Sequence, residues 1–281
     1  MTATLFDPRI CELGEGAFWH PEREQAFWFD ILGRRLLSNH DGQALEWRFE
    51  EKASAMGWID RECVLVATET ALIRLDLRDG SREILTPLEA DRPDTRSNDG
   101  RADPMGGFWI GTMAHDGGGG KGAIYRWYRG ELRKLRAGVS IPNAICFAPG
   151  GRLAYFADTA EQTVWSQELD DQGWPVAEAS VFLDLTGTDE HPDGAVTDAQ
   201  GRFWNARWGS GAVVCHAPDG HVLHRLRLPP AQSTCPAFIG QGLDRLMVTS
   251  AAENLHGAQD GSTWLIDPKG ARGLPEPRVI L

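Results

Sequence analysis

The stretch Asn98-Asp99-Gly100-Arg101-Ala102-Asp103-Pro104 decides the fold, because the chain repeats its plan. Each clear copy opens with an oxygen-bearing side chain, runs through four variable residues to a turn, and leads into an aromatic strand. The clear copies are 15–21 (EGAFWHP), 143–149 (NAICFAP) and 193–199 (DGAVTDA), and weaker copies begin at Ala55 and Pro236. A strand-rich plan that recurs about every 44 residues indicates the blades of a β-propeller.

The rest of each repeat also has the character of β-strands. Apolar, aromatic segments typical of buried strands follow the first segments, at 26–31, 63–68, 107–113, 153–158, 202–207 and 245–250. Alternating segments typical of a third strand come next, at 72–76, 123–127, 163–167 and 212–216. Asp-Gly pairs then predict turns into a more polar fourth strand, at 41–42, 79–80 and 219–220.

Six copies of four antiparallel strands predict an all-β fold, a six-bladed β-propeller that occupies residues 1–281 as one domain. No stretch of ten or more residues shows a helical period. The strand-like segments 4–6 and 278–280 lie outside the repeats. We therefore expect both ends of the chain to contribute strands to one blade and so close the ring.

Charge and hydropathy exclude several classes of partner. The chain has 28 basic and 40 acidic residues and a formal net charge of −12, whereas nucleic acids and anionic membranes require a basic face. No apolar run reaches the roughly 20 residues that span a bilayer. We expect a small-molecule partner, no nucleic-acid or membrane partner, and a monomer or weak homo-oligomer.

The cysteines and the first residues bear on the compartment. Residues 1–7 have no basic segment followed by an apolar one, so we expect no signal peptide. The five cysteines are scattered and form no Cys-x-x-Cys pair, which favours buried free thiols over a zinc cage or a redox couple. This usage predicts a cytoplasmic protein.

The repeat geometry predicts where a site would form. If equivalent positions of the blades face the axis, then Glu15, Asn98, Asn143 and Asp193 converge at one mouth of the channel. The turn between the first two strands is short, so the loop after the second strand returns to this same rim. That places Asp116 and its glycine run there, with Arg96 two residues before Asn98.

These residue types indicate metal chemistry. Carboxylate and amide oxygens without sulfur or imidazole suit one divalent cation, namely calcium, manganese or magnesium, and less characteristically zinc or ferrous iron. A cation and an arginine at one mouth fit attack of water on an ester carbonyl. Because Asn-Asp-Gly and Asp-Gly also open ordinary turns, each residue alone has a purely local interpretation.

The chain closely resembles the senescence marker protein/gluconolactonase/regucalcin family of sugar lactonases. The resemblance rests on 13–19 (LGEGAFW), 96–113 (RSNDGRADPMGGFWIGTM), 191–194 (HPDG) and 198–204 (DAQGRFW). It implies a six-bladed propeller that holds one divalent cation and hydrolyses a sugar-acid lactone to the aldonic acid in carbohydrate metabolism.

By residue, the resemblance implies that Glu15, Asn143 and Asp193 bind the metal and that Asp193 also acts as general base. It further implies that Arg96, Asn98 and Asp116 contact the substrate. The chain departs from the family pattern in two places: Pro142-Asn143-Ala144 stands where Ser-Asn-Gly is usual, and Asp116 stands where some relatives have Glu.

The expected rim of the channel indicates the class of substrate. It combines hydrogen-bonding groups with the aromatic faces of Trp19 and Trp208, beside His191. Arg96 is the one evident permanent cation nearby, so we expect an unphosphorylated five- or six-carbon aldonolactone. Two alternatives stay open at this point: a non-catalytic regulatory propeller that binds metal and sugar, and a phosphotriester or aryl-ester hydrolase on the same fold.

Overall fold

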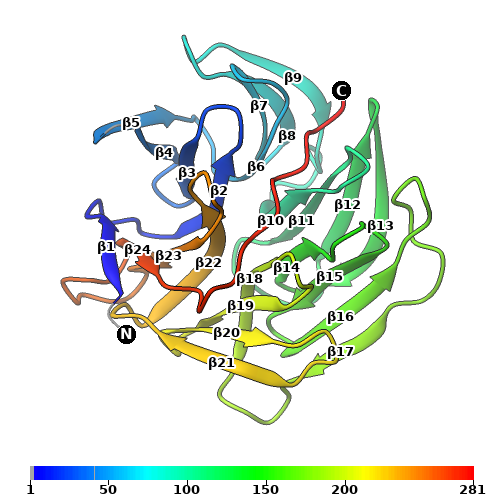
Figure 1. Cartoon of the computed structure of the whole chain (residues 1–281). Helices are drawn as coiled ribbons and strands as arrows, with labels where there is room; N and C mark the ends of the chain where they lie inside the picture. The colour runs from blue at the N-terminus through cyan, green and yellow to red at the C-terminus, as the bar shows by residue number, and fades with distance from the viewer. Residues whose placement is uncertain (1–2, 41) are drawn as a thin grey trace.

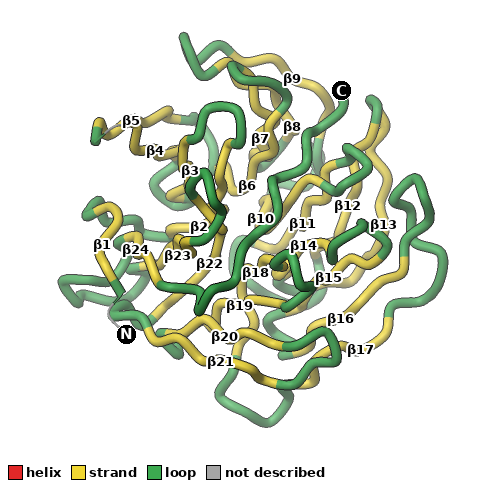
Figure 2. The backbone as a smooth tube through the Cα atoms, viewed as in Figure 1, coloured by secondary structure: helices red, strands yellow, loops and turns green. Residues whose placement is uncertain are grey.

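The computed structural model describes residues 3–40 and 42–281. In this part of the chain the regular elements are all β-strands (Figures 1 and 2). The strands form six four-stranded antiparallel sheets, which stand around a central axis like blades (Figure 1). The predicted six-bladed β-propeller is therefore confirmed. Among the described residues no helix is long and apolar enough to cross a membrane.

The first two strands of each blade are largely buried, as are most residues of third strands such as β8 (Ala71–Asp76) and β20 (Ala212–His216). The first strands line the channel: β2 (Gly14–His20), β6 (Ala53–Trp58), β10 (Thr95–Ala102), β14 (Pro142–Phe147), β18 (His191–Thr197) and β22 (Gln232–Ile239). The second strands are β3 (Gln25–Asp30), β7 (Cys63–Thr68), β11 (Phe108–Ala114), β15 (Leu153–Asp158), β19 (Phe203–Trp208) and β23 (Arg245–Ala251). These second strands match the predicted segments to within one residue at each end.

The third and fourth strands form the outer part of each blade, and fourth strands such as those at 43–48 and 222–227 are largely exposed. The third strands are β4 (Arg35–His40), β8 (Ala71–Asp76), β12 (Gly122–Tyr128), β16 (Thr163–Glu168), β20 (Ala212–His216) and β24 (Thr263–Ile266). The fourth are β5 (Gln43–Arg48), β9 (Arg82–Pro87), β13 (Glu131–Val139), β17 (Ser180–Asp184), β21 (Val222–Arg227) and β1 (Thr4–Asp7). Of the predicted Asp-Gly turns, the first includes Asp41, which lies outside the described residues.

Ring closure differs from the prediction in one respect. The last sheet has the order β1-β24-β23-β22, so an N-terminal strand does complete the C-terminal blade. However, the C-terminal strand of this sheet is β24, and the expected strand at 278–280 is wrong. That segment instead crosses the end of the channel, where Val279 N donates to Trp58 O and Ile280 N donates to Gly106 O, both at 2.8 Å.

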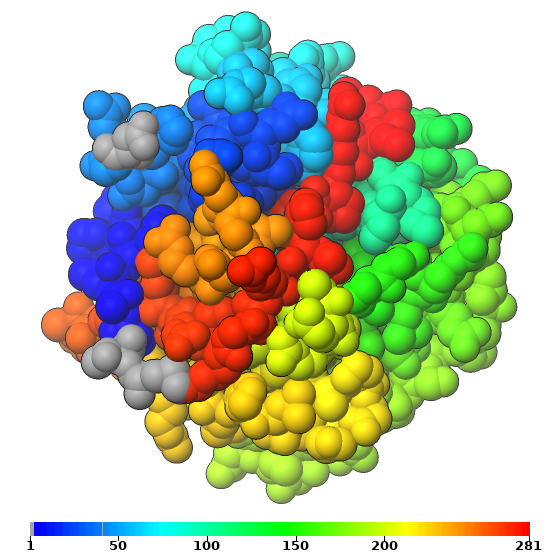
Figure 3. All heavy atoms as spheres, viewed as in Figure 1, coloured from blue at the N-terminus to red at the C-terminus, as the bar shows by residue number. Residues whose placement is uncertain are grey.

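The C-terminal segment covers one mouth of the channel. Figure 3 shows the last residues, in red, filling the centre of this face. Beneath them Arg101 of β10 forms an ion pair with Glu276, and the indole of Trp58 donates to the Glu276 carbonyl at 2.7 Å. The starts of the first strands, where the candidate site residues lie, point to the opposite mouth.

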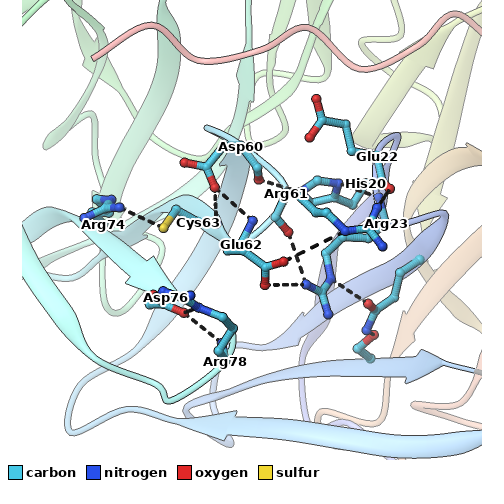
Figure 4. Close-up of polar contacts among 12 residues, drawn as sticks. His20, Glu22, Arg23, Asp60, Arg61, Glu62, Cys63, Arg74, Asp76 and Arg78 are labelled. Atoms are coloured by element: carbon cyan, nitrogen blue, oxygen red, sulfur yellow. Dashed lines mark hydrogen bonds and ion pairs between the residues drawn. The ribbon is translucent and has the colours of Figure 1, made fainter.

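Contacts between turns join neighbouring blades on the covered face. Figure 4 shows the β2–β3 turn against the β6–β7 turn, where His20 Nε2 lies 3.0 Å from Asp60 O and Arg23 Nη1 donates to Glu62 at 3.2 Å. Burial lowers the pKa of His20 to about 4, so this histidine is a neutral packing residue. The five cysteines are all free and buried, as expected.

Candidate metal and substrate site

A cavity of about 460 Å³ opens at the mouth that the C-terminal segment leaves free. Its walls carry Glu15, Arg96, Asn98, Asn143 and Asp193, which the sequence places there, together with apolar and polar residues from the surrounding loops. The further lining residues are Leu13, Met113, Ile141, Thr159, Ala160, His191, Trp208 and Glu253. Five of the six predicted site residues therefore share one cavity.

Irregular pairing in the first strands turns these side chains toward the axis. Each first strand shifts register against its second strand near its start, for example between Glu15 and Phe18 and between Asn143 and Cys146. Such bulges re-aim side chains. The register is not the uniform one expected from sequence: Glu15 and Asn143 are the last paired residues before the shift, whereas Asn98 and Asp193 lie unpaired within it.

The backbone after Asn143 explains one departure from the family pattern. Ala144 has φ 58°, and Gly16, which follows Glu15, has φ 57°. This left-handed conformation costs little for glycine and more for alanine. Pro142-Asn143-Ala144 therefore keeps the backbone shape that a glycine would adopt, and the Asn143 side chain stays in the cavity.

A chain of hydrogen bonds links three neighbouring blades across the site. Arg96 Nη1 donates to Asn98 Oδ1 at 2.8 Å, and Asn98 Nδ2 donates to Asn143 Oδ1 at 3.0 Å. Asn143 Nδ2 in turn donates to Thr159 Oγ1 at 2.8 Å, and that hydroxyl donates to Pro192 O at 2.6 Å. The chain fixes which end of each amide faces which neighbour.

Thr159 is a site residue that the sequence analysis missed. It follows β15, so it belongs to the loops after second strands that the geometry had placed on this rim. The signal was its position directly after Asp158, at the end of the strand that pairs with Asn143. Its hydroxyl holds the Asn143 amide nitrogen, and the amide oxygen, which accepts one hydrogen bond from Asn98, keeps a second lone pair for a ligand.

The two carboxylates of the site lie in an environment that disfavours their charge. Glu15 is 7% exposed and Asp193 is 3% exposed. Burial, and then the charge of Glu15, raises the pKa of Asp193, and burial, followed by the charge of Asp99, raises that of Glu15. Burial also raises the pKa of Asp99 to about 6. Three acidic groups are therefore held close to the channel axis in surroundings that favour their protonated forms.

This donor set fits a divalent cation. Two buried carboxylates whose ionised forms repel each other are stabilised when a hard cation binds between them. In the described part of the chain, no three His, Cys, Asp or Glu side chains form a metal-binding group. The candidate set accordingly consists of two carboxylates and the Asn143 amide oxygen, with open positions for water and substrate.

Arg96 supplies the positive charge of the cavity. Its side chain is buried, which lowers its pKa, while Glu15 and Glu253 are among the charges that oppose this shift. Besides Asn98, its Nη1 atom donates to Ser97 O at 2.9 Å. The described contacts involve Nη1 alone, so Nη2 and Nε are available for a ligand.

Two residues expected beside the substrate do not line the cavity. Asp116 is exposed, does not line the cavity, and accepts a hydrogen bond from Gly118 N at 3.0 Å. Trp19 lies at the far end of β2, where it packs with Ala17 and Ala26, because residue 19 is several pleats from the mouth. His191 and Trp208, in contrast, line the cavity as expected.

Fold and site together define a class: a six-bladed β-propeller whose open mouth holds buried carboxylate and amide side chains beside an arginine. Residues 13–252 match the family described as the SMP-30/Gluconolactonase/LRE-like region, and the chain belongs to this family.

Individual relatives agree with this membership. An L-arabinolactonase of Azospirillum brasilense is 36% identical over 90% of this chain and 85% of its own. A 6-deoxy-6-sulfogluconolactonase of Pseudomonas putida is 31% identical over 90% of this chain and 87% of its own. The crystal structure of regucalcin from Agrobacterium tumefaciens, described as a calcium-binding protein, superimposes with a TM-score of 0.97 at 39% identity, covering 100% of this chain and 98% of that one.

Proposed function

We propose that this protein hydrolyses a sugar-acid lactone to the open aldonic acid, with a divalent cation held by Glu15, Asn143 and Asp193. One observation carries the proposal: two buried carboxylates with raised pKa values share a cavity of about 460 Å³ with Arg96. Relatives named as lactonases cover most of the chain, which supports the ester bond of a lactone as the target.

The chain's own residues account for binding and proton transfer. Arg96 donates to sugar hydroxyls, and the hydrogen bonds from Arg96 through Asn98 to Asn143 hold these groups in place. Asp193 accepts a proton from the water whose oxygen attacks the ester carbonyl carbon. The ring carbon–oxygen bond then breaks, and the leaving oxygen takes up a proton to become the hydroxyl of the aldonic acid.

A divalent cation at this position would polarise the ester carbonyl and favour ionised Asp193. Glu15 contributes negative charge to hold the cation, and Asn143 contributes a neutral oxygen. Burial keeps bulk water away from these groups, which strengthens their electrostatic interactions.

The cavity favours a neutral substrate. Arg96 is the one residue with a guanidinium or ammonium group among the residues that line the cavity. Three carboxylates line it as well, those of Glu15, Asp193 and Glu253. The net charge of −12 also repels anions at a distance. We therefore expect an unphosphorylated five- or six-carbon aldonolactone, such as the glucono-, galactono-, xylono- or arabinono- form.

A pH-stat panel tests the proposal. Aldonolactones, aryl esters and phosphotriesters are assayed with the purified protein, first loaded with Ca²⁺, Mn²⁺, Mg²⁺ or Zn²⁺ and then treated with a chelator. Lactone hydrolysis that the chelator abolishes is the expected result. Metal binding without turnover of any ester would instead support a regulatory propeller, and turnover of phosphotriesters alone would overturn the lactonase assignment.

A further inference from the structure

Glu253 is a third acidic residue of the cavity, and no motif in the sequence points to it. It lies in the turn after β23. Ala252 N donates to the carbonyls of Cys11 and Glu12, both at 3.1 Å, and Ala251 pairs with Leu13. These contacts tie the turn to the segment that enters β2, so Glu253 is held at the open mouth close to the strand that carries Glu15.

The Glu253 carboxylate is free to bind a ligand. In the described part of the chain this carboxylate has no hydrogen-bond or ion-pair partner. The backbone oxygen of Glu253 accepts a hydrogen bond from Gln232 Nε2 at 3.2 Å. Glu69, another acidic residue near Arg96, differs because Lys52 neutralises it at 3.3 Å. A half-buried carboxylate with two free oxygens can accept hydrogen bonds from two neighbouring sugar hydroxyls.

Charge balance gives Glu253 a second effect. Glu15, Asp193 and Glu253 against Arg96 leave a formal charge of −2 on the cavity lining, which a divalent cation would bring to zero. Without Glu253 the loaded cavity would carry a formal charge of +1 and would attract an anionic substituent. Glu253 therefore makes the difference between a neutral site and a cationic one.

We propose that Glu253 determines which lactones this protein accepts: it binds hydroxyls of a neutral sugar lactone and repels lactones that carry a phosphate, sulfonate or carboxylate group. The inference rests on the proposed lactonase function and names the residue that sets its substrate class. Glu253 acts through contact and charge at the substrate, outside the set of metal ligands.

The test compares kcat/KM for glucono-1,5-lactone with that for its 6-phospho derivative, on the metal-loaded full chain. The variants are Glu253→Gln, which removes only the charge, and Glu253→Lys, which reverses it. Glu12→Gln and Glu12→Lys are matched controls, because Glu12 is exposed, does not line the cavity, and lies beside Ala252. Metal content and thermal unfolding are measured for every variant.

We expect the preference for the neutral lactone to fall about tenfold in Glu253→Gln and further in Glu253→Lys, because a like charge no longer faces the phosphate. KM for the neutral lactone should rise about fivefold through loss of hydrogen bonds, with kcat changed less. Metal content and both Glu12 variants should match the parent protein.

The outcomes separate this inference from the proposed function. If the parent protein hydrolyses neither lactone, the lactonase function itself fails. If it hydrolyses lactones but the neutral-to-anionic ratio is the same in the parent and both Glu253 variants, only the role of Glu253 is refuted. Loss of bound metal in Glu253→Gln would also refute it, by showing that Glu253 is a ligand.

Discussion

Asn98 Nδ2 donates a hydrogen bond of 3.0 Å to Asn143 Oδ1, which joins the first strands of two neighbouring blades at the mouth of the channel. The same Nδ2 group also donates to Pro142 O at 2.9 Å. Asn98 thus holds both the Asn143 side chain and the backbone carbonyl just before it. Its most direct described role is to orient a candidate metal ligand, while contact with the substrate stays a prediction.

Thr159→Val should weaken metal binding without unfolding the protein. Valine has nearly the same shape but cannot accept from Asn143 Nδ2 or donate to Pro192 O, so the ligand amide loses its anchor. Loss of such an outer partner costs about 10- to 100-fold in metal affinity, which calorimetric titration with Mn²⁺ or Ca²⁺ would measure. Thr70→Val is the control, because Thr70 also follows a second strand, and among the described residues its hydroxyl contacts Glu51 alone. Equal affinities for parent and Thr159→Val would contradict the anchoring role.

Asp193→Ala should abolish lactone hydrolysis, because Asp193 has two proposed roles, ligand and general base. A general base contributes about 100- to 10,000-fold to the rate. We therefore expect kcat to fall about 100-fold or more, even at metal concentrations that restore metal binding. Asp189→Ala, at an exposed position four residues earlier, should behave like the parent protein. Near-normal turnover by Asp193→Ala would rule out the mechanism.

Arg96→Ala should raise KM for aldonolactones about tenfold or more and leave metal content intact. A hydrogen bond to a charged group contributes about 1.5 to 3 kcal/mol, and Asn143 keeps its contacts with Asn98 and Thr159 in this variant. Steady-state kinetics and elemental analysis measure the two effects, and Arg227→Ala on an exposed outer strand serves as control. Unchanged kinetics would show that Arg96 does not contact the substrate.

Metal should stabilise the protein more at pH 8 than at pH 5. The pKa values of Glu15, Asp193 and Asp99 are raised in the folded state, so the metal-free fold prefers their protonated forms and loses stability as pH rises through these values. A cation requires ionised ligands, so its affinity increases with pH.

Thermal unfolding in chelator and in excess Ca²⁺ measures this effect. We expect the melting temperature in chelator to fall by about 5 °C or more between pH 5 and pH 8, and excess cation to restore about as much. In the double variant Glu15→Gln/Asp193→Asn the pH dependence should flatten and the response to Ca²⁺ should disappear. An undiminished Ca²⁺ response in that variant would mean that the cation binds elsewhere.

The sequence predicted the blades and most of the site because both depend on periodic features. Second strands such as Cys63–Thr68 and Leu153–Asp158 are apolar or aromatic runs that end in one polar residue, and they occur where expected. Glu15, Asn98, Asn143 and Asp193 repeat with the blades, so their convergence follows from the geometry of a ring. Their exact register did not follow, because bulges break the strand period.

What the sequence did not predict depends on loops and on the end of the chain. Thr159 and Glu253 lie in turns after second strands, where no periodic pattern marks the direction of a side chain. Residues 278–280 look like a strand but meet turn and strand-end carbonyls instead of a sheet edge. Contacts of this kind join distant parts of the chain and leave no local signal.

Completion of the last blade by β1 has a consequence for synthesis of the chain. Thr4 pairs with Leu265 and Leu5 with Trp264, so β1 finds its partner only after the strands of the five other blades have been synthesised. Until then the edges of the growing array are unpaired, and exposed strand edges are prone to aggregation. The speed of translation and the presence of chaperones should therefore influence the yield of active protein.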